Sequence, residues 1–264
     1  IVLAVKTYSL EKVAQLIKDQ VGDKAIIVAL QNGIDNQAIL SRYFSKVIYG
    51  IVSYNAWLDN PGVVGFQKRG PLILGTVGNT MQNELHQICA LFSRGVETIP
   101  TDRLQDAARS KMGVNLTNSF ATLVGHRFRE ISDPALFQKL LTNLTYEGVQ
   151  ILKAAGYKEA RLGGMPSWLT MTAAATLPPA LIRPIFNKNV KKMVLSSMAQ
   201  DILQRGGTDS ELDSLNGYFI QLADKYDVKA PFNRAVYSLC KEHFGKPGFK
   251  PIDVKDVWAR VQKQ

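Results

Sequence analysis

Residues 110–119, with the sequence SKMGVNLTNS, place one lysine and two asparagines in an apolar run that predicts a buried helix. Lys111, Asn115 and Asn118 stand at positions i, i+4 and i+7, so they share one face of that helix. Burying an ammonium and two carboxamides is costly unless something pairs with them, and a polar, oxygen-rich ligand would do so. The structural alternative is a lysine that reaches solvent from the helix edge, beside two capping or solvent-facing asparagines.

The sequence before this stretch has a different character from the sequence after it, and the change falls near Asp102. Residues 1–5 and 25–30 are short apolar runs that predict strands. Between them, apolar residues recur at helical spacing, with Ser9 as the expected N-cap. A strand–helix–strand unit of this length implies a parallel sheet, and ligands bind beyond the carboxyl ends of such strands.

Two groups of polar residues stand at those predicted strand ends. Lys6 follows the first strand, and Gln31-Asn32-Gly33 follows the second. Gly33 is most simply a turn glycine, and Asn32 fits either turn chemistry or contact with a ligand. Their shared position favours neither reading over the other.

The remaining patterns predict an α/β domain over residues 1–102 and a helical domain over residues 103–264. In the first, we expect a strand at 47–52, a hairpin formed by 63–66 and 72–74, a helix at 85–92 and a strand at 96–99. In the second, one apolar stripe predicts a helix over 136–152, and another predicts a helix over 212–226. Residues 165–186 are apolar but interrupted by prolines, which predicts a helical hairpin or irregular segment and not a membrane span.

Composition narrows the classes of function. The chain has 264 residues, 46% of them hydrophobic, and a formal net charge of +10. Its lysines and arginines are spread along the chain, which favours anionic small molecules over nucleic acid or an acidic membrane. Cys89 and Cys240 form neither a disulfide framework nor a metal-ligand cluster, so we expect no metal site and a reducing, cytoplasmic location.

Four stretches, in order, resemble the ketopantoate reductases (2-dehydropantoate 2-reductases). They are the Lys111-x3-Asn115-x2-Asn118 pattern; VLAVK at 2–6 with QNG at 31–33; NPG at 60–62 followed by GPLILG at 70–75; and SM at 197–198 with QD at 200–201, followed by ELDSLNG at 211–217. The resemblance covers nearly the whole chain. It implies an incomplete Rossmann-type NADP-binding domain followed by an all-α domain of the 6-phosphogluconate-dehydrogenase-like type.

The same resemblance implies NADPH-dependent reduction of ketopantoate, or of a related 2-keto acid, by hydride transfer. Because no side chain donates a hydride, the reaction needs a nicotinamide cofactor, and the resemblance implies that it is NADP(H). The resemblance assigns Lys111 as the general acid and Glu211 as the active-site carboxylate near cofactor and lysine. It assigns contacts with the substrate to Asn32, Asn115, Asn118 and Ser197. It assigns contacts with the cofactor to Lys6, Asn32 and Ala56. The implied partner is a small-molecule 2-keto acid, with a homodimer left open.

The chain departs from the family pattern in three respects. Asp209 competes with Glu211 for the carboxylate role, because the interval after Ser197 is two residues longer than the common pattern. Ser119 and Val194 stand where asparagines are common, which leaves room for a changed substrate pocket.

The third departure concerns the phosphate-binding turn. No G-x-G-x-x-G motif occurs in the 264 residues. We therefore expect this chain to bind NADPH weakly or not at all and to show no reductase activity, and we expect a preceding strand–GxGxxG–helix segment of roughly 65–75 residues to restore both. The alternative reading is a non-catalytic binding or scaffold protein that has lost cofactor binding.

Overall fold

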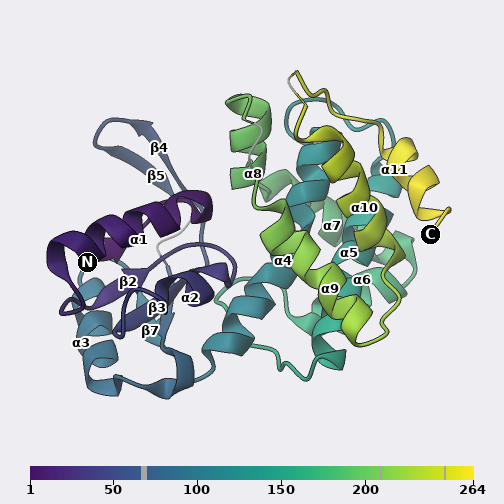
Figure 1. Ribbon diagram of the computed structural model, residues 1–264. Helices are drawn as coiled ribbons and strands as arrows, with labels where there is room; N and C mark the ends of the chain where they lie inside the picture. The colour runs from purple at the N-terminus through teal and green to yellow at the C-terminus, as the bar shows by residue number, and fades with distance from the viewer. Residues whose placement is uncertain (67–69, 208–209, 247) are drawn as a thin grey trace. The chain divides into compact units, whose positions relative to one another are not determined.

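The computed structural model describes residues 1–66, 70–207, 210–246 and 248–264. The chain forms two compact units, each with its own core. One comprises Ile1–Met112 and Glu159–Met165, and the other comprises Gly113–Lys158 and Pro166–Gln264. The first is an α/β unit and the second is helical (Figure 1). The division by contacts falls inside one continuous helix, α4 (Leu104–Val124).

The α/β unit is built on a five-stranded sheet. Its strands, in spatial order, are β1 (Val2–Leu3), β2 (Ile27–Ala29), β3 (Val47–Val52), β6 (Leu72–Gly75) and β7 (Thr98–Pro100). The first three strands are parallel, β6 is antiparallel to β3, and β7 is parallel to β6. The predicted strand–helix–strand unit at the start of the chain is therefore confirmed.

Helices cover both faces of this sheet. Because successive strand residues point to opposite sides, each face contributes its own apolar side chains to a core. On one face, Ile27 and Ala29 pack in a cluster with residues of α1 (Thr7–Val21), α2 (Asp35–Leu40) and the start of α4. On the other face, Val28 packs in a cluster with residues of α3 (Gln82–Phe92). The buried, β-branched composition of these strands follows from this double cover. In Figure 1, α1 and α2 are the purple helices beside the sheet.

Two local predictions for this unit were wrong. Residues 63–66 do not pair with residues 72–74. Instead, β5 (Val63–Phe66) pairs with β4 (Ala56–Asn60) as a separate ribbon, while β6 enters the main sheet between β3 and β7. The tight turn between β4 and β5 uses Gly62 at φ +81°, which glycine adopts without strain. Ser9 is not an N-cap, because α1 begins at Thr7 and Lys6 precedes it.

The helical unit contains the second half of α4 and a series of further helices. In chain order these are α5 (Pro134–Ala154), α6 (Trp168–Thr176), α7 (Pro179–Lys192), α8 (Ser197–Ala199), the π-helical turns η2 (Gln200–Gln204) and η3 (Asp213–Gly217), α9 (Tyr218–Lys225), α10 (Pro231–His243) and α11 (Val254–Val261). The segment 165–186 forms two helices, as one of the alternatives predicted, but Pro184 lies inside α7 and does not end it, and α7 continues to Lys192. Among the described residues, no helix is both long enough and apolar enough to cross a membrane.

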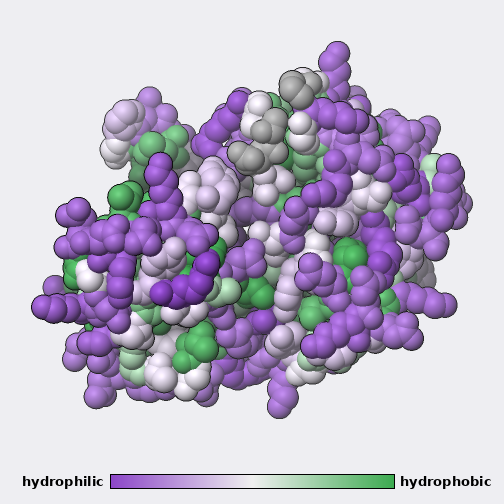
Figure 2. All heavy atoms as spheres, viewed as in Figure 1, coloured by the Kyte–Doolittle hydropathy of each residue, from purple (hydrophilic) through white to green (hydrophobic). Residues whose placement is uncertain are grey.

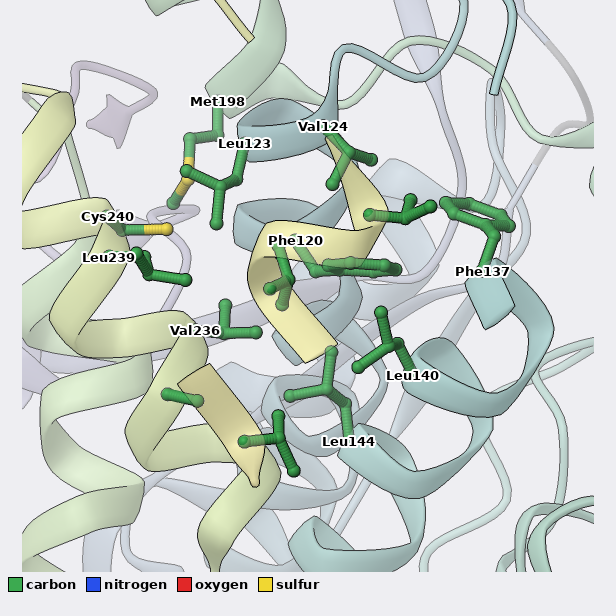
Figure 3. Packing of buried hydrophobic residues seen from close by; sticks show 14 of the residues in the cluster. Phe120, Leu123, Val124, Phe137, Leu140, Leu144, Met198, Val236, Leu239 and Cys240 are labelled. Carbon is green, nitrogen blue, oxygen red and sulfur yellow. The ribbon is translucent and has the colours of Figure 1, made fainter. Parts of the chain in front are cut away.

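The core of the helical unit joins α4, α5, α10 and α11 (Figure 3). Phe120 on α4 stacks on Phe137 of α5 with ring centroids 5.2 Å apart. Leu140 and Leu144 continue the α5 stripe and are fully buried. Each such leucine contributes about 1.5–3 kcal/mol to folding relative to an exposed position. On the face of the molecule seen in Figure 2, hydrophobic atoms form small separate patches among hydrophilic ones.

A buried carboxylate caps the first turn of α10. Glu147 on α5 is 6% exposed and accepts hydrogen bonds from the backbone N–H groups of Phe232 and Asn233, at 2.9 and 2.8 Å. The residue at the helix N-cap, Ala230, has no side chain that could do so. Burial raises the pKa of Glu147 to about 7, although its hydrogen bonds oppose that rise. A side chain from α5 therefore replaces the local cap that the sequence of α10 lacks.

Candidate functional site in the α/β unit

The carboxyl ends of β1 and β2 bring two polar segments to one edge of the sheet. Lys6 is half-buried and directly precedes α1, three residues after the end of β1. Asn32 lies in the turn after β2, followed by Gly33 at φ +82°. Gly33 is thus a turn glycine, as the sequence suggested, because few other residues adopt that conformation. The parallel pairing of the two strands sets both segments at the same edge.

Lys111 reaches this edge from α4. Its Nζ donates a hydrogen bond to Asn32 Oδ1 at 2.7 Å, joining residues 79 positions apart. Lys111, Asn115 and Asn118 are half-buried, whereas most other residues of this part of α4 are buried. That pattern agrees with the predicted polar stripe along one face of the helix. The functional roles of Asn115 and Asn118 stay predictions.

A pocket surrounds the Asn32–Lys111 pair. It encloses about 310 Å³, which includes space open to solvent. Its walls come from the turn after β2, from α2, from the middle of β3 and from the first half of α4. The lining residues are Gln31, Asn32, Gly33, Asn36, Gln37, Tyr49, Gly50, Ile51, Leu104, Ala108 and Lys111. Burial raises the pKa of Tyr49 to about 12, so its phenol stays neutral at physiological pH.

A chain of carboxamides runs from α4 to the pocket wall. Arg109, 9% exposed, donates from Nη1 to Gln105 Oε1. Gln105 Nε2 in turn donates to Gln37 Oε1 at 2.8 Å. Because a guanidinium can only donate, it fixes which end of the Gln105 amide faces Gln37. Arg109 therefore orients the amide of Gln105, and Gln105 in turn holds Gln37 in the pocket wall.

Gln31 ties the two strand ends together. Its Nε2 donates to the backbone carbonyls of Leu3 at 2.9 Å and Val5 at 3.2 Å. These bonds hold the segment that leads to Lys6 against the turn that contains Asn32. Sequence reasoning recognised Gln31 only as part of a turn, and it missed Asn36, Gln37, Gln105 and Arg109 altogether. A buried glutamine two residues after a fully buried strand was the available signal for Gln31.

The other predicted site residues lie elsewhere in the chain. Ala56 is the exposed first residue of β4. Ser197 begins α8 in the helical unit, and its neighbour Ser196 is the N-cap that accepts from Ala199 N. Glu211 is half-buried, two residues before η3. Asp209, the competing carboxylate, lies outside the described residues.

The part of the chain that the structure describes contains no candidate metal site. No group of three or more histidine, cysteine, aspartate or glutamate side chains there is arranged to hold a metal ion. The polar groups that meet at the sheet edge are instead the ammonium of Lys111 and the carboxamide of Asn32.

Comparison with protein families decides the relationship of the chain. Residues 103–244 match the family described as "Ketopantoate reductase PanE/ApbA C terminal", and residues 1–79 match "Ketopantoate reductase PanE/ApbA". The chain belongs to the ketopantoate reductase PanE/ApbA family. The family resemblance inferred from the four sequence stretches is confirmed.

Known relatives agree with this assignment. The 2-dehydropantoate 2-reductase of Halobacterium salinarum is 26% identical over 249 residues, covering 91% of this chain and 74% of that protein. Among solved structures, a PanE/ApbA family ketopantoate reductase from Ralstonia eutropha has a TM-score of 0.65 at 22% identity and covers 99% of this chain and 76% of its own. A D-mandelate dehydrogenase solved with NADH and anilino(oxo)acetate has a TM-score of 0.71 at 19% identity, covering 92% and 75%.

These structural likenesses confirm the fold of this ketopantoate reductase family member. Its α/β unit is Rossmann-like, and its second unit is helical. The family is one of oxidoreductases, and the solved neighbours include a dehydrogenase with NADH bound. Lys111 and Asn32 meet at the carboxyl edge of the parallel strands, the edge at which ligands bind in open α/β sheets.

Proposed function

We propose that the protein is an NADPH-dependent reductase that converts 2-dehydropantoate, or a related 2-keto acid, to the corresponding 2-hydroxy acid. The observation that carries this proposal is the hydrogen bond from Lys111 Nζ to Asn32 Oδ1, at the carboxyl edge of the sheet. Membership of the ketopantoate reductase family supports the same reaction class.

Lys111 is the proposed general acid. As the carbonyl oxygen of the keto acid gains negative charge, Lys111 Nζ gives it a proton and later regains one from water. An ammonium has three N–H donors, and the bond to Asn32 fixes the direction of one of them. Asn32 therefore acts by orienting Nζ, and it also lies close enough to the pocket to contact a ligand itself.

The family motifs assign roles to residues of the helical unit as well. Asn115 and Asn118 follow Lys111 along one face of α4, and we assign them to the carboxylate and hydroxyl groups of the substrate. Ser197 is assigned to the substrate, and Glu211 to the active-site carboxylate. These assignments rest on the family motifs and on the continuity of α4.

The cofactor supplies the hydride when it is bound. The residues around Lys6 fit an anionic group of such a cofactor. Thr7 Oγ1, at the first position of α1, is buried and has no hydrogen-bond partner among the described residues. The first turn of α1 contains no acidic residue, and its N-terminus attracts negative charge. Lys6, Thr7 and this helix end would hold a phosphate oxygen, and the family motifs assign Asn32 and Ala56 to the cofactor as well.

The direct test is a steady-state assay in which the loss of NADPH is followed with a panel of 2-keto acids. When the chain is joined to a preceding strand–GxGxxG–helix segment, we expect turnover with 2-dehydropantoate or a branched relative, and a higher kcat/KM with NADPH than with NADH. The matched binding experiment is isothermal titration of the same keto acids into the protein and into its Lys111→Ala variant. A protein that neither turns over nor binds any 2-keto acid would contradict the proposal.

A further inference from the structure

Two buried oxygen atoms in the pocket wall have no hydrogen bond. Gln31 is 7% exposed and Asn36 is 3% exposed, and both side chains line the pocket. Gln31 Oε1 and Asn36 Oδ1 have no partner among the residues that the structure describes. Buried polar atoms in native proteins are nearly always paired, with protein, water or ligand. An unpaired acceptor at the edge of a pocket therefore points to an occupant of the pocket.

The orientation of the Gln31 amide is determined by its backbone contacts. Its nitrogen faces the carbonyl oxygens of Leu3 and Val5, which can only accept hydrogen bonds. Rotating the amide by half a turn would set oxygen against oxygen. Gln31 Oε1 is therefore fixed as the acceptor that remains, and the occupant must supply a hydrogen.

The charges around the pocket decide what kind of donor it takes. An anion such as a carboxylate would be repelled by the two amide oxygens, which carry partial negative charge. A cation would lie in the same pocket as the ammonium of Lys111, with the guanidinium of Arg109 behind Gln105. Tyr49 is neutral. A neutral donor avoids both penalties.

We propose that Gln31 Oε1 and Asn36 Oδ1 form a binding site for one neutral hydrogen-bond donor group, next to the Asn32–Lys111 pair. A water molecule and an N–H or O–H group of a bound ligand share this chemistry. The first source depends only on the pocket. The second rests on the proposed reduction, because the nicotinamide carboxamide and a substrate hydroxyl are the ligand groups of this type.

A high-resolution crystal structure of the protein without ligand tests the site itself. We expect one water molecule within hydrogen-bond distance of both Gln31 Oε1 and Asn36 Oδ1. Gln31→Met and Asn36→Leu keep the number of side-chain heavy atoms but remove the acceptor, and each should lose this water. Gln87→Met, at an exposed position on α3, is the matched control and should keep it. A dry pocket in the unchanged protein would overturn the proposal.

A second crystal, grown with NADPH, separates the two sources. An amide NH₂ that replaces the water assigns the site to the cofactor, whereas a retained water assigns it to solvent, and either result supports the site. A carboxylate, a phosphate or a metal ion bound to Gln31 Oε1 would overturn it. Because the ligand-free crystal is read without any turnover, failure of the reductase proposal and failure of this site are distinguishable.

Discussion

At the scale of single residues, Lys111 and Asn32 have separable tasks, because one carries the proton and the other orients it. In an intact enzyme that also carries the strand–GxGxxG–helix segment, Lys111→Ala should lower kcat by ~10²-fold or more and leave cofactor affinity close to that of the unchanged protein. The side chain is half-buried on a long helix, so its loss leaves the core intact. The measurement is steady-state turnover together with NADPH titration.

Lys12→Ala is the matched control for this experiment, since Lys12 is an exposed lysine on α1 of the same unit. It should leave kcat unchanged. Equal turnover by the Lys111→Ala and Lys12→Ala variants would end the general-acid assignment.

The carboxylate of the site gives a second residue-level prediction. Glu211→Gln should impair reduction more than Asp209→Asn does, because Glu211 keeps the register of the family motif with Asn216-Gly217. That register continues into η3, where Asn216 and Gly217 are buried. Comparing kcat/KM of the two variants with one keto acid decides the assignment. A larger loss for Asp209→Asn would reverse it.

Only part of the residue-level site could be predicted. Local spacing placed Lys111 on a helical face and Asn32 in a turn, but their contact joins residues 79 positions apart. Family resemblance, and not the periodicity of either segment, assigned both residues to one site. Gln31 was recognised only as part of a turn, and Asn36 was missed, because a glutamine and an asparagine near a turn have ordinary local explanations. Their significance lies in what they fail to contact, which only three-dimensional packing reveals.

At the scale of elements, the cap of α10 by Glu147 makes stability depend on pH. Burial raises the pKa of Glu147 from the ordinary 4.5 to about 7, so the folded state holds a proton that the unfolded state releases between these values. The contribution of Glu147 to stability is therefore full below about pH 4.5 and is lost as the pH rises through about 7. The shift corresponds to about 3 kcal/mol.

Urea unfolding across that pH range measures the effect. Glu147→Gln cannot titrate, so the difference in free energy of unfolding between wild type and variant should change by up to about 3 kcal/mol between roughly pH 4.5 and 8. Glu130→Gln, at an exposed glutamate, is the control and should show a far smaller change. Parallel pH profiles for wild type and Glu147→Gln would contradict this account.

Element pairing was harder to predict than element type. The strands at 63–66 and 72–74 were recognised, yet their pairing with each other was wrong. Nearness in sequence favoured a hairpin, but β6 gains burial on both faces by entering the main sheet. The strand β4, with the sequence AWLDN, is wholly exposed and so lacks the alternating pattern that marks half-buried strands. Pairing depends on the whole sheet, which no local window contains.

At the scale of the whole molecule, the change from α/β to purely helical patterns could be predicted, because apolar residues repeat every two positions in strands and every 3.6 in helices. The expected boundary at residue 102 does not coincide with the division by contacts. The helix α4 starts at Leu104, whereas contacts divide the chain between Met112 and Gly113, inside that helix. Periodicity marks where an element begins, but it does not mark which core each turn of a continuous helix joins.

The net charge of +10 leads to the last prediction, because a basic protein can bind polyanions without specificity. The 32 basic residues stand against 22 acidic ones and are spread along the chain. Association with duplex DNA should therefore show no sequence preference and should fall steeply between ~50 and ~200 mM salt, as counterion release requires. Fluorescence anisotropy with two unrelated duplexes is the measurement. Binding that survives at ~200 mM salt and prefers one duplex would favour a nucleic-acid partner over small anionic ligands.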